Sequence, residues 1–194
     1  GKISVKTEID FMKDETGLEE FEKEWSEIIK TYPKDMQEAF KDYTGGGYAI
    51  NRYYRGHDLT PRERHLELSK LIDKDFKQTL GKDVYLRRGV NHGAIEGLGI
   101  DDISKAKGLI VSEPGYLSTS VKGGFEDLDY TFIFEPDKNL KGAYLNSISN
   151  YGVQYMDKDE QEFEFLFARG QEIEILQTTQ LANGKWIINA RILQ

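Results

Sequence analysis

The 194-residue chain contains no cysteine. Without thiols it can form neither disulfide bonds nor cysteine-ligated metal sites. The absence suits a cytosolic protein, and it equally suits a secreted protein that must unfold and refold while crossing a membrane. Cysteine usage therefore leaves the compartment open.

The chain also lacks an excess of basic residues and long apolar runs. It contains 26 Lys and Arg residues and 34 Asp and Glu residues, which gives a net charge of −8. This negative charge argues against general nucleic-acid binding. No apolar run approaches the roughly 20 residues that a membrane-spanning helix needs, so we expect no membrane span. The chain starts at Gly1 without a signal peptide, and we expect targeting information to have been trimmed from it.

Histidine is scarce as well. The three histidines, His57, His65 and His92, show no metal-ligand spacing with one another or with the acidic residues. We therefore expect no metal, and we interpret each histidine as an ordinary surface or packing residue.

Apolar periodicity predicts helices in the first part of the chain. Leu18, Phe21 and Trp25 recur at helical spacing within residues 16–32. Residues 33–56 predict two short helices joined by a glycine hinge at Gly45–Gly47. A third helix is predicted to begin with Thr60 as its N-cap and Pro61 at its first position, and to stop at Gly81.

From residue 83 the pattern changes to short strands separated by turn residues. Asn183-Gly184 predicts a hairpin between the last two strands, and residues 101–110 predict a short helix. The order of helices and then strands indicates an α+β fold in one domain, 1–194, with a helical layer at about 15–81 and a β core at about 82–194. The predicted strands are 84–89, 115–120, 130–136, 142–146, 162–168, 172–180 and 185–193.

Three small motifs lie at predicted strand ends. Arg87-Arg88 precedes a glycine, and paired guanidinium groups suit a phosphate. Ser118-Thr119-Ser120 supplies three hydroxyls that can orient a carboxylate or bind a ribose, although for this motif alone an ordinary turn is the favoured interpretation. Glu162 and Glu164 are two apart, so a regular strand would point both to one face with Cβ atoms about 6–7 Å apart. A solvated strand face is the simpler interpretation of either glutamate alone.

Taken together and in this order, the motifs resemble those of the mono-ADP-ribosyltransferases of the arginine–serine–glutamate class, which include binary-toxin and C3-like bacterial toxins. "YTGGGYAIN" at 43–51 and "KGAYLNSISNYGVQ…EQEFEFLFARG" near the end are similar to two further family segments. The resemblance implies N-terminal helices packed on a two-sheet antiparallel β-sandwich with a central NAD cleft. It also implies transfer of ADP-ribose from NAD to an arginine of a target protein.

The resemblance assigns catalytic roles residue by residue. Glu164 would stabilise the ribosyl cation, Ser118 would hold Glu164, and Glu162 would orient the acceptor guanidinium. Arg88 would bind the NAD phosphate, with Arg87 as the second choice. Further NAD contacts would come from Tyr43, Tyr48, Asn51, Arg52, Thr119, Ser120 and the stacking aromatic Phe125.

The same resemblance implies the partners. Tyr151 or Tyr155, in the loop before the glutamates, would recognise the acceptor. The acceptor would be actin or another host protein, reached by a secreted toxin that acts in the host cytoplasm, with or without a delivery component outside this chain. Two alternatives stay open: an NAD glycohydrolase, in which water is the acceptor, and a non-catalytic adaptor copy of the same fold.

Overall fold

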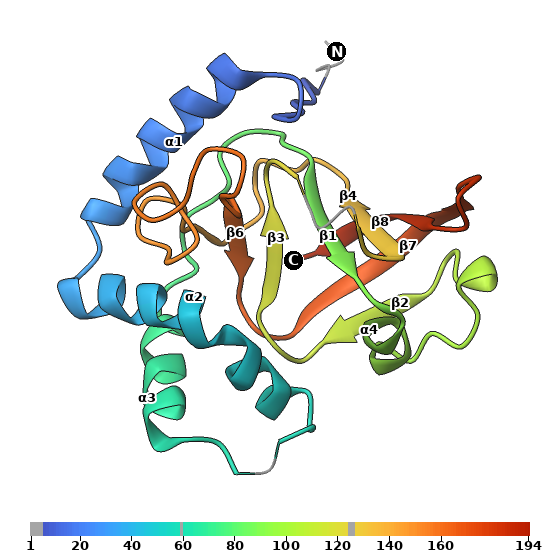
Figure 1. The fold of residues 1–194 in the computed structure, drawn as a ribbon, viewed down its shortest axis with the longest axis horizontal. Helices are drawn as coiled ribbons and strands as arrows, with labels where there is room; N and C mark the ends of the chain where they lie inside the picture. Colours follow the sequence, from blue (N-terminus) through green and yellow to red (C-terminus); the bar gives the residue numbers. More distant parts are fainter. Residues whose placement is uncertain (1–5, 59, 124–126) are drawn as a thin grey trace, which may run out of the picture.

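Helices precede and flank a sheet in the computed structural model, which describes residues 6–58, 60–123 and 127–194. Figure 1 shows the helices α1 (Glu15–Lys30), α2 (Lys34–Tyr54) and α3 (Glu63–Ile72) along one side of the strands. No helix within the described residues is long and apolar enough to cross a membrane. The predicted α+β class is confirmed.

Helix α1 begins at a side-chain cap and packs through an apolar stripe, as predicted. Asp14 accepts the Gly17 backbone N–H at 2.9 Å, which satisfies one of the free amides of the first turn. The buried residues of α1 include Phe21 and Trp25. The Trp25 ring meets the Phe165 ring edge-on with centroids 5.6 Å apart, and this contact joins the helical layer to the sheet.

Helix α2 runs without interruption through Gly45–Gly47, so the predicted glycine hinge is wrong. A Cβ atom at Gly47 would lie 2.8 Å from the Tyr43 ring, one turn earlier in the helix. The glycine therefore leaves room for the tyrosine instead of breaking the helix.

The third helix is shorter at both ends than predicted. It starts after Arg62 as the N-cap, and the expected cap Thr60 instead donates its backbone N–H to the Asp58 carboxylate at 3.0 Å. It ends at Ile72, well before Gly81. Phe76 follows with a positive φ of 61°, which a continuing helix would not allow.

The eight strands form one mixed sheet in the order β2-β7-β8-β4-β1-β3-β6-β5. The expected pair of separate antiparallel sheets is therefore not seen, because β4 and β8 pair in parallel and link the two halves. In Figure 1, β6, β3 and β1 stand upright while β7 and β2 run diagonally beside them. The strands are β1 (Leu86–Val90), β2 (Ile110–Glu113), β3 (Leu117–Ser120), β4 (Tyr130–Phe134), β5 (Ala143–Tyr144), β6 (Glu164–Phe167), β7 (Gln171–Gln180) and β8 (Trp186–Leu193).

Two elements were not predicted from the sequence. Strand β2 pairs with β7 at the sheet edge, and helix α4 (His92–Gly97) follows β1 with Asn91 as its cap. The short helix expected at 101–110 is the 3-10 turn η1 (Ile103–Lys105). The hairpin between β7 and β8 is confirmed, and Gly184 takes the positive φ of 86° that its turn requires.

Candidate active site

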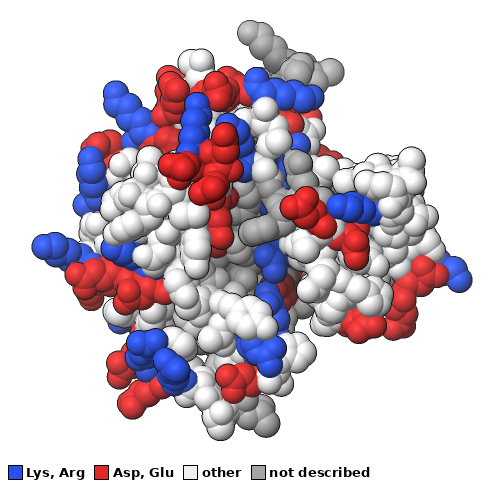
Figure 2. Space-filling view, in the orientation of Figure 1, with Lys and Arg blue, Asp and Glu red and all other residues white. Residues whose placement is uncertain are grey.

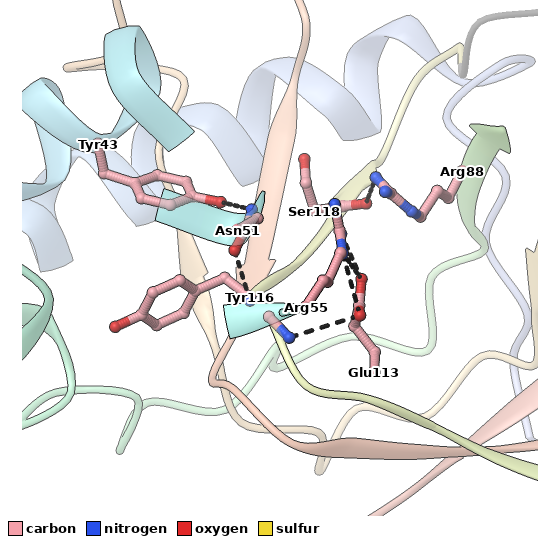
Figure 3. Close-up of polar contacts among 8 residues, drawn as sticks. Tyr43, Asn51, Arg55, Arg88, Glu113, Tyr116 and Ser118 are labelled. Atoms are coloured by element: carbon pink, nitrogen blue, oxygen red, sulfur yellow. Dashed lines mark hydrogen bonds and ion pairs between the residues drawn. The ribbon is translucent and has the colours of Figure 1, made fainter. Parts of the chain in front are cut away.

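Three side chains predicted to act together lie on the neighbouring strands β1, β3 and β6. The Ser118 hydroxyl donates a hydrogen bond of 2.5 Å to the Glu164 carboxylate. The Arg88 guanidinium donates to the Ser118 carbonyl oxygen at 3.1 Å (Figure 3). The sheet thus brings together an arginine, a serine and a glutamate that are 30 and 46 residues apart in sequence.

Glu164 is a buried acid, with 6% of its surface exposed. Its pKa is raised to about 7: burial is the largest cause and the nearby Glu162 charge adds to it, while the Ser118 hydrogen bond and the Arg88 charge lower it. A carboxylate poised near neutral pH in a dry setting can stabilise a growing positive charge.

Glu162 does not share a regular strand with Glu164, which corrects the prediction of two acids on one strand face. Strand β6 starts at Glu164, and the intervening Phe163 has a left-handed φ of 49°. The alternation of side chains is therefore broken between the two acids. Burial raises the pKa of Glu162 as well, and its carboxylate makes no hydrogen bond or ion pair with the residues that the structure describes.

The other hydroxyls of the serine–threonine motif fix the backbone. Thr119 donates to the Phe165 carbonyl at 2.7 Å, and Ser120 donates to the Glu162 carbonyl at 2.8 Å. Both bonds tie the end of β3 to the segment that carries the two glutamates.

The two successive arginines of β1 have different partners. Arg87 forms two hydrogen bonds with the Asp10 carboxylate, at 3.0 and 2.9 Å. Arg88 instead lines a cavity of about 420 Å³ between the end of α2, β1 and α4. Burial lowers the pKa of Arg88, and the nearby Arg55 charge lowers it further.

Guanidinium groups gather at this cavity. Its walls include Arg52, Arg55 and Arg88, while Tyr48, which is 77% exposed, stands at its mouth. Figure 2 shows basic side chains along the hollow that runs down the middle of this face, although the chain as a whole is acidic. Such a cluster suits a diphosphate. The Ser118–Glu164 pair lies beside the cavity and is not part of its walls.

Arg55 and its partner Glu113 were not predicted from the sequence. Arg55 Nε donates to the two oxygens of Glu113 at 3.0 and 3.2 Å, which holds the guanidinium at the cavity wall (Figure 3). Arg55 follows Arg52 by three residues and Asn51 by four, so helical spacing from the predicted NAD contacts was the signal that could have revealed it.

Tyr43 and Asn51 form a buried chain of hydrogen bonds behind the cavity. Asn51 donates to the Tyr43 hydroxyl at 2.9 Å and accepts the Tyr116 backbone N–H at 2.8 Å (Figure 3). A Cβ atom on Gly115 would lie 2.8 Å from the Asn51 side-chain oxygen, so only glycine allows this approach. The two residues brace α2 against the start of β3.

Comparison with known proteins decides the family. The family model described as ADP-ribosyltransferase exoenzyme matches residues 18–194. The chain belongs to this family. No curated protein sequence matches the chain significantly.

Solved structures show the same fold as this exoenzyme. Plx2a, an ADP-ribosyltransferase toxin from Paenibacillus larvae, matches with a TM-score of 0.78 and 24% identity over 96% of this chain and 100% of its own. The Clostridium limosum C3 exoenzyme matches with a TM-score of 0.75 and 20% identity over 98% of each chain. C3stau2 from S. aureus, solved with NAD, matches with a TM-score of 0.73 and 22% identity over 91% of this chain and 96% of its own.

The exoenzyme's loop before the glutamates exposes two aromatic residues. Tyr151 and Tyr155 are 41% and 53% exposed, and the Tyr155 hydroxyl accepts a hydrogen bond of 2.7 Å from Lys41 of α2. Phe125, the expected stacking aromatic, lies outside the described residues. Within the described part of the chain, no three His, Asp or Glu side chains are grouped to hold a metal ion.

Proposed function

We propose that this exoenzyme binds NAD and transfers its ADP-ribose to an arginine side chain of a protein, releasing nicotinamide. The observation that carries the proposal is the Ser118–Glu164 hydrogen bond beside a cavity walled by three arginines. This arrangement offers a diphosphate site and a carboxylate for a ribosyl cation next to each other.

The cavity residues divide the binding of NAD among them. Arg88 binds the diphosphate, because its planar guanidinium group donates paired hydrogen bonds to phosphate oxygens. Arg55 is already paired with Glu113, so it supplies positive charge at the cavity wall. Arg52 and Tyr48 cover the adenosine side of NAD. The Arg52 Cζ atom lies 5.7 Å from the centroid of the Tyr48 ring, over its face. Four residues support these groups from behind: Tyr43, Asn51, Thr119 and Ser120. Arg87 is the alternative phosphate ligand. Phe125 stacks on the nicotinamide.

Glu164 acts on the bond that breaks. It accepts a hydrogen bond from the 2′-hydroxyl of the nicotinamide ribose, and its negative charge stabilises the cation that grows on the ring as the C1′–N bond lengthens. Neutral nicotinamide leaves with the bonding electron pair. One such electrostatic contact is worth about 3–4 kcal/mol in the transition state.

Glu162 acts on the acceptor. Its carboxylate has no partner among the described residues, so it is available to receive an arginine guanidinium. It orients the attacking nitrogen toward C1′ and takes the proton that this nitrogen loses when the new C–N bond forms. A carboxylate at this position favours a cationic acceptor, which supports arginine.

The acceptor protein is a host protein, with actin as the first candidate, and Tyr151 and Tyr155 contact it. The exoenzyme acts as the catalytic domain of a secreted bacterial toxin in the host cytoplasm, with a delivery component supplied separately. The family match and the likeness to Paenibacillus larvae Plx2a, described as a toxin, support this proposal.

The test uses NAD labelled in its adenylate part. Wild-type protein, Glu164→Ala and Glu162→Gln are incubated with a eukaryotic lysate and separately with a free arginine ester. We expect wild type to label a lysate protein on arginine by mass spectrometry, and Glu164→Ala to lose at least ~10²–10³ in rate. Glu162→Gln should lose transfer more than hydrolysis. Label on asparagine, or an unimpaired Glu164→Ala, contradicts the proposal.

The labelling assay and a calorimetric measurement of NAD binding separate the two alternatives. Free ADP-ribose without labelled protein indicates an NAD glycohydrolase. Failure of the wild-type protein to bind NAD by calorimetry indicates a non-catalytic adaptor.

A further inference from the structure

Asn146 is a buried amide at the root of the loop that carries Glu162. Its exposed fraction is 0%, and it follows the short strand β5. Its side-chain nitrogen donates to Glu22 and to Gln161, each at 2.9 Å, and its oxygen accepts the Phe163 backbone N–H at 3.2 Å. One side chain thus joins helix α1, the loop and the residue between the two glutamates.

Phe163 holds a backbone conformation that its side chain disfavours. Its φ of 49° lies in the left-handed region, which costs a residue other than glycine about 1–2 kcal/mol. Two hydrogen bonds keep it there: the one from its N–H to Asn146, and one from the Val121 N–H to its carbonyl at 3.0 Å. The Asn146 bond therefore opposes the relaxation of Phe163 to an ordinary φ.

Glu22 of α1 holds Asn146 in turn. One oxygen of the Glu22 carboxylate accepts the Tyr144 hydroxyl at 2.6 Å and the Asn146 amide at 2.9 Å. Among the described residues, no lysine or arginine forms an ion pair with the Glu22 carboxylate, whose hydrogen-bond partners are Tyr144 and Asn146. The amide orientation of Asn146 is thus set by an acceptor on a helix far away in sequence.

We propose that Asn146, oriented by Glu22, is a positioning residue that sets the direction of Glu162 relative to Glu164. It thereby sets how ADP-ribose divides between an acceptor guanidine and water. The inference rests on the proposed function and assigns a new determinant of its acceptor step.

The two glutamates differ in how firmly they are held. Glu164 pairs with Ser120 in the sheet, and its carboxylate is bonded to Ser118. Glu162 lies before the strand, and the described residues hold it only through its backbone: its N–H donates to the Tyr151 carbonyl at 2.9 Å and its carbonyl accepts from Ser120 at 2.8 Å. A relaxed Phe163 therefore turns Glu162 while Glu164 stays in place. Transfer to a guanidine falls, and hydrolysis continues.

The loop approaches Asn146 too closely to adjust around it. A Cβ atom at Gly152 would lie 2.0 Å from the Asn146 carbonyl oxygen, and the Val153 N–H donates to that oxygen at 3.0 Å. A displaced Asn146 therefore also displaces the segment around Tyr151.

The test measures protein-bound and free ADP-ribose for each variant in one assay. Asn146→Asp keeps the shape but replaces the donor with an oxygen that faces the acceptor oxygens of both Glu22 and Gln161. We expect transfer to fall about 10–100-fold, the size expected when buried polar groups lose their hydrogen-bond partner, with hydrolysis within about 3-fold of wild type. Glu22→Gln keeps an acceptor oxygen and should leave the ratio unchanged. The double variant Asn146→Asp/Glu22→Gln regains a donor on the Glu22 side and should recover part of the lost transfer. Glu27→Gln, exposed on the same helix, is the matched control.

The outcomes separate this inference from the proposed function. A wild-type protein with neither activity contradicts the proposed function. An active wild type whose Asn146→Asp variant keeps its ratio of transfer to hydrolysis contradicts only the role of Asn146, whether both activities persist or both fall together. Melting curves for each variant establish that it is folded, and no recovery in the double variant excludes Glu22 as the residue that orients Asn146.

Discussion

The Ser118 hydroxyl donates its hydrogen to the Glu164 carboxylate at 2.5 Å, across two neighbouring strands. Because the bond stabilises the charged form of Glu164, it lowers the pKa against the raising effect of burial, and with the neighbouring charges the net pKa is about 7. A serine thus keeps a buried acid partly ionised at neutral pH. This relationship sets the pH dependence of any step that needs the Glu164 anion.

Ser118→Ala should move the pH profile of NAD cleavage upward. Wild-type kcat/KM should rise with pH through an apparent pKa near 7, since this parameter reports ionisations of the free enzyme. Without the hydroxyl the pKa of Glu164 rises, so the variant should lose more activity at pH 6.5 than at pH 9. An equal loss at every pH would show that Ser118 does not control this ionisation.

Glu164→Gln should stabilise the NAD-free protein at neutral and alkaline pH. The folded-state pKa of Glu164, about 7, lies above its ordinary value of 4.5, so the folded state holds this proton more tightly than the unfolded state. Wild-type stability from this group is complete below about pH 4.5 and is lost as pH rises through 7. The difference between a pKa of about 7 and the ordinary value of 4.5 corresponds to about 3 kcal/mol of unfolding free energy, which is lost at alkaline pH.

Urea unfolding at pH 4.5 and pH 8 measures this difference. The variant should resemble wild type at the lower pH and exceed it at the higher pH. Glu27→Gln, an exposed change, should show no such trend. A constant difference between Glu164→Gln and wild type would count against the burial of the charge as its cause.

Local patterns were enough to predict several features of the fold. The stripe of Phe21 and Trp25, the Asn183-Gly184 turn and the strand that carries the serine motif all depend on spacing within a few residues. The parallel pairing of β4 with β8 brings together residues about 56 apart, such as Tyr130 and Trp186, and no local pattern encodes it. The single mixed sheet was therefore missed.

The site shows the same division. The meeting of Arg88, Ser118 and Glu164 was implied by the resemblance of the ordered motifs to the ADP-ribosyltransferases, whereas the break between Glu162 and Glu164 was not. Strict alternation of acid and phenylalanine predicts a continuous strand, and tertiary hydrogen bonds to Phe163 from Asn146 and Val121 override it. Arg55 was missed because its role depends on contact with Glu113, which lies 58 residues away.

Gly46→Ala should stabilise the protein, because α2 is continuous at this position. A Cβ atom there would lie 3.5 Å from the His65 ring nitrogen, an ordinary contact. Alanine restricts the unfolded chain and favours helix, which is worth about 0.5–1 kcal/mol relative to glycine. Thermal melting measures the change, and Gly47→Ala is the comparison. Its Cβ would meet the Tyr43 ring at 2.8 Å, so it should destabilise. Loss of stability in Gly46→Ala would show that the added Cβ atom does not fit beside His65.

Arg88→Lys and Arg87→Lys should separate the two neighbouring arginines. Lysine keeps the charge but loses the planar fork that binds phosphate through two hydrogen bonds. Arg88 lines the cavity beside Arg55, so Arg88→Lys should weaken NAD binding about 10–100-fold, as expected for hydrogen bonds to a charged group. Arg87 is occupied by Asp10 and does not line the cavity. Arg87→Lys should therefore change the NAD dissociation constant by less than about 5-fold, because the ion pair that it rearranges is worth at most about 1 kcal/mol.

Isothermal titration calorimetry of both variants with NAD provides the measurement, and Asp10→Asn serves as a third arm. Asp10→Asn removes the charge that holds Arg87 without touching the cavity. If Arg87 is a structural residue, Asp10→Asn and Arg87→Lys should lower the melting temperature together and leave NAD affinity intact. If Arg87→Lys instead weakens NAD binding more than Arg88→Lys does, the phosphate ligand is Arg87, and the ion pair with Asp10 must open when NAD binds.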